Sequence, residues 1–264
     1  KKIIFLTGKG GTGKSSVAVA VGLFLRSLGR KVLLVETGES RPALERYFSA
    51  RVEMEPRLAA PGLWVSNVDF MGAMEAYIRQ VIPVRKIVNA ILSNRVVRYF
   101  LDATPGAREL VMLSRFHQLA SLQERGRDRF DVVVVDLPAS GHAVNMFGTL
   151  RVIQRVFEVG PLRARSEEII RNFSDPDYSG LIVVSIPEEM SINETIETAE
   201  SVQNLQLPPL LGVLLNRFPD VAFPDAVGEA IVALDEEEQG GVTGLMLEAG
   251  ATRFRGQQRA EDAL

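Results

Sequence analysis

Residues 3–15 read Ile-Ile-Phe-Leu-Thr-Gly-Lys-Gly-Gly-Thr-Gly-Lys-Ser, and this stretch decides the fold of the chain. The four apolar residues at its start predict a short buried strand, and the apolar run 17–28 after it predicts a helix. The glycine-rich loop between them fits the pattern G-x-x-x-x-G-K-[ST]. Its fixed positions are occupied by Gly8, Gly13, Lys14 and Ser15. A strand before the loop and a helix after it indicate a phosphate-binding loop rather than an accidental glycine turn.

The chemistry of such a loop follows from its residue types. Glycines let backbone N–H groups approach phosphate oxygens, and the helix that follows adds the positive end of its dipole. Lys14 is placed to reach the outer phosphates, and the Ser15 hydroxyl is placed to coordinate Mg²⁺. The nucleotide contacts predicted for this segment are Gly10, Gly11, Thr12, Gly13, Lys14, Ser15 and Ser16.

Composition narrows the class of protein. The chain has 264 residues, enough for one large α/β domain with a subdomain. A net charge of −3 and a pI near 5.6 give no electrostatic footprint for nucleic acid or an anionic membrane. The absence of cysteine excludes disulfides, thiolate zinc sites and Cys-ligated iron–sulfur clusters. No apolar run reaches the about 18–20 residues of a membrane span, and no secretory signal opens the chain, so we expect a cytoplasmic protein without direct membrane insertion.

Further strands are predicted along the chain at 31–36, 63–68, 130–136, 181–186 and 210–215. The strand 130–136 ends in Asp136, which is how a carboxylate is presented to a phosphate-bound magnesium ion. The first two strands and the helix between them form a βαβ unit. Within the helix that follows 181–186, Ser191 and Glu194 are three residues apart, as in a capping box. The strand pattern predicts a three-layer α/β sandwich with a mostly parallel sheet.

The pattern between 70 and 126 is helical and predicts a helical subdomain inserted in one domain that covers 1–264. Two apolar runs in this segment, 84–101 and 110–122, cover more than one helix face. They are explained either by burial on two sides, the commoner fate of apolar residues, or by a surface that receives a partner. Beyond 236 the acidic and polar composition predicts a mobile loop and a tail.

Lys9, directly after Gly8, resembles the early lysine of a deviant phosphate loop. That loop is typical of the arsenite-pump ATPases, the ATPases that target tail-anchored membrane proteins, the MinD and ParA ATPases and the nitrogenase iron protein. The segment Asp136-Leu-Pro-Ala-Ser-Gly-His142 resembles switch II of the first two groups, with its Ala and Pro exchanged. The chain therefore resembles the arsenite-pump and tail-anchored-targeting family of P-loop NTPases to about residue 218.

The resemblance implies ATP and Mg²⁺ as cofactors and assigns several roles. Lys9 would reach across a dimer interface to the phosphates of the other subunit, as a catalytic residue. Gly141 would place its N–H against the γ-phosphate, Asp136 would bind magnesium with Ser15, and Asn216 would hydrogen-bond the adenine. The family's water-positioning aspartate aligns with Gly38, and Glu36 and Glu39 lie close by. Glu39 is therefore the candidate catalytic acid, against the alternative of a solvated loop charge.

Two functions of different class follow from the resemblance. One is an ATPase that acts as a dimeric switch and couples Mg-ATP binding to an unidentified client protein. The other is a nucleotide-binding regulatory or scaffold subunit with degenerate hydrolysis, as a homodimer or as half of a heterodimer with a related ATPase. Gly38 favours the second, and intact Lys9, Lys14, Ser15 and Asp136 favour ATP binding in both.

Overall fold

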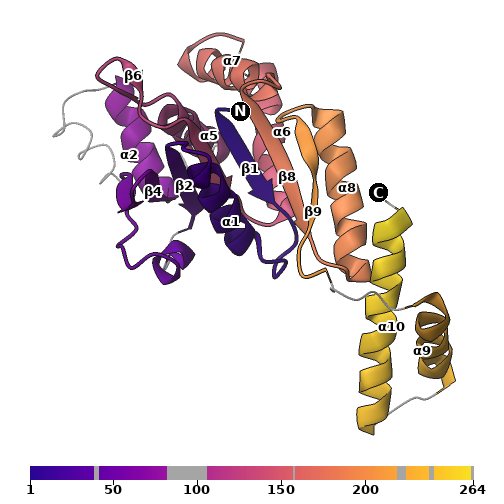
Figure 1. The fold of residues 1–264 in the computed structure, drawn as a ribbon. Helices are drawn as coiled ribbons and strands as arrows, with labels where there is room; N and C mark the ends of the chain where they lie inside the picture. Colours follow the sequence, from indigo (N-terminus) through magenta and orange to yellow (C-terminus); the bar gives the residue numbers. More distant parts are fainter. Residues whose placement is uncertain (39–41, 82–105, 157, 219–223, 238–240, 263–264) are drawn as a thin grey trace.

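The structure is a computed structural model, and it describes residues 1–38, 42–81, 106–156, 158–218, 224–237 and 241–262. Its central feature is a sheet in which the described residues form seven strands, in the order β3-β4-β2-β7-β1-β8-β9 (Figure 1). The strands are β1 (Ile3–Thr7), β2 (Val32–Thr37), β3 (Arg57–Ala60), β4 (Leu63–Val68), β7 (Val132–Asp136), β8 (Ser179–Ser185) and β9 (Leu210–Leu215). Every pairing is parallel except that of β3 with β4, so the predicted sheet is confirmed.

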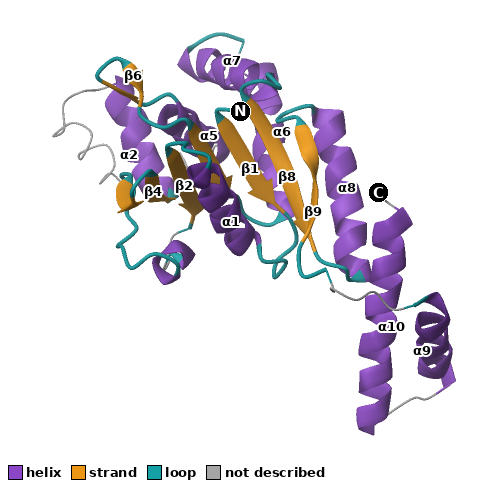
Figure 2. Cartoon of the chain, in the orientation of Figure 1, coloured by secondary structure: helices purple, strands orange, loops and turns teal. Residues whose placement is uncertain are grey.

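Helices cover both faces of this sheet, which gives the expected three layers (Figure 2). They are α1 (Lys14–Ser27), α2 (Phe70–Val81), α5 (Ala107–Ala120), α6 (Ser140–Val156), α7 (Pro161–Ser174), α8 (Glu189–Leu205), α9 (Asp225–Glu237) and α10 (Gly241–Asp262). A short 3₁₀ helix, η1 (Ala43–Arg46), and a small hairpin of β5 (Gln123–Glu124) and β6 (Arg127–Asp128) complete the described elements. The described helices include none that is long and apolar enough to cross a membrane.

The two hydrophobic cores lie on opposite faces of the sheet. Successive residues of β1 point alternately into the two cores. Ile4 and Leu6 pack on the α1 side, and Ile3 and Phe5 pack on the side of α5, α6 and α7. All five residues of β1 are buried, as expected for a central parallel strand that is covered on both faces. The ring of Phe5 lies at the centre of the larger core, 5.1 Å from the rings of both Phe147 and Phe173.

The C-terminal region differs from the prediction of a mobile loop and tail after residue 236. Residues 241–262 form α10, which packs against α8 and α9, so the prediction is wrong for this part (Figure 1). Its composition is polar, but Ala251, Phe254 and Gln257 are buried along one side of the helix. The burial of that one side is the physical reason that a polar segment is helical here.

The helical segment 70–126 divides into a described and an undescribed part. The apolar residues 110–119 of α5 are buried in the larger core, which confirms packing rather than a partner surface for this run. The first run, 84–101, lies outside the described residues, so its role and the inserted subdomain as a unit stay predictions. His117 is also buried, and its Nε2 lies 2.6 Å from Asn172 Nδ2.

Candidate functional site

The candidate site lies at the edge of the sheet where the parallel strands end. Thr7, Thr37 and Asp136 are the last residues of β1, β2 and β7, which are neighbours in the sheet. The Leu6 and Glu36 positions are both in register with Asp136. Open α/β sheets bind ligands at this edge because the loops that follow the strands converge there.

The phosphate loop leaves β1 in a conformation that depends on glycine. Gly8 has φ 147°, and a Cβ on it would lie 2.0 Å from the carbonyl oxygen of Val184, so the backbone of β8 approaches too closely for any side chain. Inside the loop, the Thr12 hydroxyl donates to the Lys9 carbonyl over 2.9 Å. The Lys14 ammonium donates to the same carbonyl over 3.3 Å. These bonds hold the loop closed ahead of α1, whose first residue is Lys14.

Ser15 and Asp136 meet as the sequence predicts. The Ser15 hydroxyl donates to Asp136 Oδ2 over 2.5 Å, and the other carboxylate oxygen, Oδ1, is buried with no hydrogen-bond partner in the described part of the chain. Burial raises the pKa of Asp136 to about 6, although the Ser15 bond and the Lys14 charge oppose this rise. A hydroxyl, an orphaned carboxylate oxygen and the oxygens of a phosphate are the ligands that Mg²⁺ prefers. The residues therefore fit the predicted ion.

The two lysines of the loop differ in their surroundings. Burial lowers the pKa of Lys14, and the nearby charges of Asp136 and Glu194 oppose that effect. Lys9 is half-buried, and in the described part of the chain its ammonium has no hydrogen bond or ion pair. Lys14 thus belongs to the site of its own subunit, while the ammonium of Lys9 is available to another molecule.

Asn216 lies beside the phosphate loop, directly after β9. Its Nδ2 donates to the Thr12 carbonyl over 2.8 Å, and its Oδ1 accepts the Arg217 N–H over 2.9 Å. A Cβ on Gly13, at φ 86°, would lie 2.5 Å from the same Nδ2. Both ends of the amide are thus engaged inside the protein, where they support the loop, and the predicted adenine contact stays a prediction.

The loop after β2, which corresponds to switch I, is described in part. Gly38 borders a small pocket of about 120 Å³ with Asp69, Arg108 and His142, whereas Glu39 lies outside the described residues. The Glu36 carboxylate accepts the backbone N–H groups of Ala43 and Leu44, over 2.6 and 2.9 Å. Glu36 is therefore occupied as the anchor of η1. Sequence reasoning also missed a contact from that helix's C-cap: the Tyr47 hydroxyl lies 2.6 Å from the Ser16 hydroxyl.

Switch II follows β7 and leads into α6. Gly141 is exposed in the first turn of α6, where backbone N–H groups have no partner within the helix. The preceding residue, Ser140, is buried, and its N–H donates to the Gly8 carbonyl over 3.3 Å. The Thr7 hydroxyl also donates to the Pro138 carbonyl over 2.9 Å. Switch II is thus joined directly to the phosphate loop and to the strand before it.

The predicted capping box of α8 is wrong. The Ser191 hydroxyl accepts the Ile186 N–H over 3.3 Å and lies beside the Ser185 hydroxyl, while the Glu194 carboxylate accepts a hydrogen bond from the Ser140 hydroxyl. The helix begins at Glu189, so Ser191 is already inside it and cannot cap it. A carboxylate three residues after a serine gives no sequence signal that distinguishes a cap from a long-range contact.

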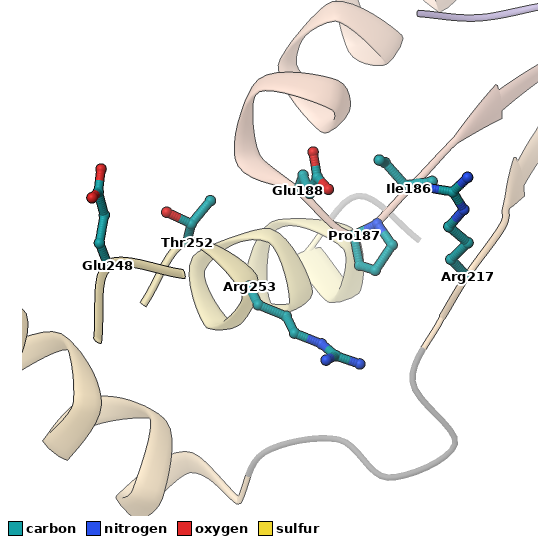
Figure 3. A pocket seen from close by; sticks show the side chains of 7 residues that line it. All are labelled: Ile186, Pro187, Glu188, Arg217, Glu248, Thr252 and Arg253. Atoms are coloured by element: carbon teal, nitrogen blue, oxygen red, sulfur yellow. The ribbon is translucent and has the colours of Figure 1, made fainter. Parts of the chain in front are cut away.

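A larger pocket lies between α10 and the segments that follow β8 and β9, and it is lined by Arg217, the residue after Asn216 (Figure 3). Its volume is about 590 Å³, and its lining mixes apolar and charged side chains. The lining residues are 186–188 after β8, Arg217 after β9, and Glu248, Thr252 and Arg253 on α10. This pocket could not be predicted from the sequence because α10 was expected to be a tail.

Comparison with known proteins places the chain among ATPases. Residues 1–163 match the family of anion-transporting ATPases, ArsA ATPase. The chain is 26% identical over 223 residues to ATPase BagA of Mycobacterium tuberculosis. This alignment covers 82% of this chain and 65% of the relative's length. It is 24% identical over 234 residues to a putative arsenical pump-driving ATPase 2 of Aquifex aeolicus, covering 77% of this chain and 76% of the relative.

A third relative is the ATPase ASNA1 homolog of Entamoeba dispar, 21% identical over 245 residues, with 78% of this chain and 73% of the relative covered. The family match covers more than half of the chain, and its range includes the phosphate loop and the segments that the resemblance assigns to switch I and switch II. The parallel sheet and the convergence of Ser15 with Asp136 are what a P-loop NTPase of this kind requires. The chain belongs to the ArsA family of anion-transporting ATPases.

Proposed function

We propose that this chain is an ATP-dependent switch that binds Mg-ATP at the phosphate loop and couples that binding to a partner protein. The proposal rests on the arrangement of Ser15, Lys14 and the buried Asp136 at the ends of β1 and β7. One carboxylate oxygen of Asp136 accepts the Ser15 hydroxyl, and the other has no hydrogen-bond partner in the described part of the chain. This arrangement joins a hydroxyl, a cation and a carboxylate where the loop N–H groups gather. A triphosphate with a magnesium ion satisfies all three.

Each group has a definite task in this proposal. The loop backbone and Lys14 would bind the phosphates, and the Gly141 N–H at the start of α6 would sense the γ-phosphate. Ser15 and Asp136 would hold Mg²⁺, which supplies positive charge beside the phosphate oxygens. The pocket beside Asn216 is where we place the base, with Arg217 and Arg253 at its edge.

We propose further that hydrolysis is slow. Gly38 has no side chain with which to hold an attacking water, and the Glu36 carboxylate is bound to the N–H groups of η1. The remaining local candidate is Glu39. Loss of a positioning or base residue typically slows such reactions by about 10²–10⁴-fold. This favours the second function, a nucleotide-binding regulatory or scaffold subunit with degenerate hydrolysis, which would use the same nucleotide site.

The dimer and the client are part of the same proposal. The half-buried Lys9 ammonium has no partner among the described residues, so it suits phosphates that belong to a second subunit. Some relatives are named arsenical pump-driving ATPases, but a chain without cysteine does not bind arsenite through thiols. A protein partner is therefore the better fit, as a homodimer, a heterodimer or a client complex.

Calorimetry with ATP and MgCl₂ tests the proposal. The parent protein should bind ATP, and Lys14→Ala should weaken binding at least about tenfold, because a charge-assisted contact is worth about 1.5–3 kcal/mol. Lys31→Ala, which changes an exposed lysine before β2, is the matched control and should bind as the parent does. Equal affinity of the Lys14 variant and the parent would contradict a phosphate-loop site.

A further inference from the structure

Glu194 on α8 joins two parts of the site that the sequence does not connect. Its half-buried carboxylate accepts the hydrogen bond of the Ser140 hydroxyl, which is 54 residues away in the sequence and 1% exposed. Ser140 is the first residue of α6, four residues after Asp136. A buried serine hydroxyl that donates to a carboxylate forms a charge-assisted bond, which is stronger than a bond between neutral groups.

The same carboxylate acts on the phosphate loop. Ser140, whose hydroxyl Glu194 holds, also donates its N–H to the Gly8 carbonyl at the start of the phosphate loop, over 3.3 Å. Through this contact Glu194 adjoins the loop, and its charge acts on Lys14 together with that of Asp136. The hydrogen bond of the Lys14 ammonium is a weak one, 3.3 Å to the Lys9 carbonyl. Nucleotide phosphates would bring several negative charges to this ammonium. They would satisfy its charge and repel Glu194.

The helix that carries Glu194, α8, is packed against α10. At the start of α8, a Cβ on Gly256 would lie 2.5 Å from the carbonyl oxygen of Pro187, and Arg259 lies 3.8 Å from Glu189. The Thr198 hydroxyl donates to the Glu194 carbonyl over 2.7 Å. Helix α8, which carries Glu194, is therefore held at its start by α10.

We propose that Glu194 is a positioning residue that couples the phosphate site to switch II. Without nucleotide its carboxylate holds Ser140 and balances the Lys14 charge. Phosphates bound at Lys14 neutralise that charge and repel Glu194, which weakens its bond to Ser140. The proposal rests on nucleotide binding at the phosphate loop. It makes the Ser140–Glu194 bond a device that keeps switch II in its resting position. It also predicts that Glu194 lowers the affinity for ATP, because its charge opposes that of the phosphates.

Three variants separate the charge of Glu194 from its hydrogen bond. Glu194→Gln keeps an oxygen that accepts the Ser140 hydroxyl but removes the charge, Glu194→Ala removes both, and Ser140→Ala removes only the bond. Glu197→Gln, at an exposed position of the same helix, is the control for a lost charge. The two measurements are ATP affinity by calorimetry and amide hydrogen exchange of residues 137–142 in the free and ATP-bound protein.

Both Glu194 variants should bind ATP about three- to tenfold more tightly than Glu197→Gln. Ser140→Ala should bind ATP more tightly than the parent but by a smaller factor, because the phosphates no longer have to loosen the bond to Glu194. In the free protein, exchange of 137–142 should rise in Glu194→Ala and Ser140→Ala and stay at the parent level in Glu194→Gln. ATP affinity of Glu194→Gln within twofold of the control would overturn the charge effect. Unchanged exchange in Glu194→Ala would overturn the role of the bond.

The exchange measurement on the free protein needs no nucleotide. It therefore tests the Ser140–Glu194 bond even if the parent protein fails to bind ATP, which is the failure of the proposed function. Thermal unfolding of each variant, followed by circular dichroism, shows whether it is folded. If Glu194→Ala does not fold, the other two variants still test the bond: exchange should rise in Ser140→Ala and stay at the parent level in Glu194→Gln.

Discussion

Asp136 offers a prediction in which stability and function change in opposite directions. Burial raises the pKa of this carboxyl from 3.8 to about 6 in the folded protein. The two pKa values differ by about 2, and a difference of one corresponds to about 1.4 kcal/mol. When the carboxyl is ionised, its burial therefore lowers the free energy of unfolding by about 3 kcal/mol. Because the folded pKa lies above the unfolded value, the folded protein is free of this cost below about pH 4, where the carboxyl is protonated. Its free energy of unfolding then falls as the pH rises through 6.

Asp136→Asn should remove that loss, since the amide does not ionise and its oxygen can still accept the Ser15 hydroxyl. We expect the free energy of unfolding of the variant, relative to the parent, to rise by about 1–3 kcal/mol between pH 4.5 and pH 7.5. For a chain of this size such a gain raises the melting temperature by roughly 2–10 °C. Urea unfolding at a series of pH values, without nucleotide or divalent cation, measures it.

The same substitution should weaken ATP binding in the presence of MgCl₂ and leave binding in EDTA nearly unchanged, because an amide is a poorer ligand for magnesium than a carboxylate. Asp177→Asn, at an exposed position, is the control and should change stability by less than about 0.5 kcal/mol at any pH. A variant less stable than the parent at pH 7.5, or a gain equal at pH 4.5 and 7.5, would refute the account of a carboxylate that is destabilised by burial.

Two further predictions concern the dimer and the rate. Lys9→Ala should bind ATP as a monomer but fail to form the ATP-dependent dimer, as measured by light scattering with ATP and MgCl₂; equal dimerisation of variant and parent would make Lys9 an ordinary loop lysine. Gly38→Asp should hydrolyse ATP faster than the parent in single-turnover experiments, because it restores a group that can hold the attacking water. A fast parent rate that collapses in Glu39→Gln would instead place the acid one residue further along the loop, and a fast rate indifferent to both changes would mean that the alignment of this loop is wrong.

Much of the site could be predicted because its parts are local in sequence. The phosphate loop needs glycines at set positions, a lysine and a hydroxyl, all within eight residues, so residues 8–15 carry their own signal. The apolar run before Asp136 predicts both a buried strand and a carboxylate at its end. Parallel strands place those ends at one edge of the sheet, and from this the contact of Ser15 with Asp136 follows.

The sequence by itself therefore determined the layered sheet, the family resemblance and the central residues of the site. Only the tertiary structure decided the partners of Glu36, Asn216 and Glu194, which hold η1, the phosphate loop and Ser140. It also decided that residues 241–262 form a helix against α8 and enclose a pocket beside Asn216. The physical reason is that a polar side chain can satisfy its hydrogen bonds locally or across the fold, and its residue type is the same in both cases.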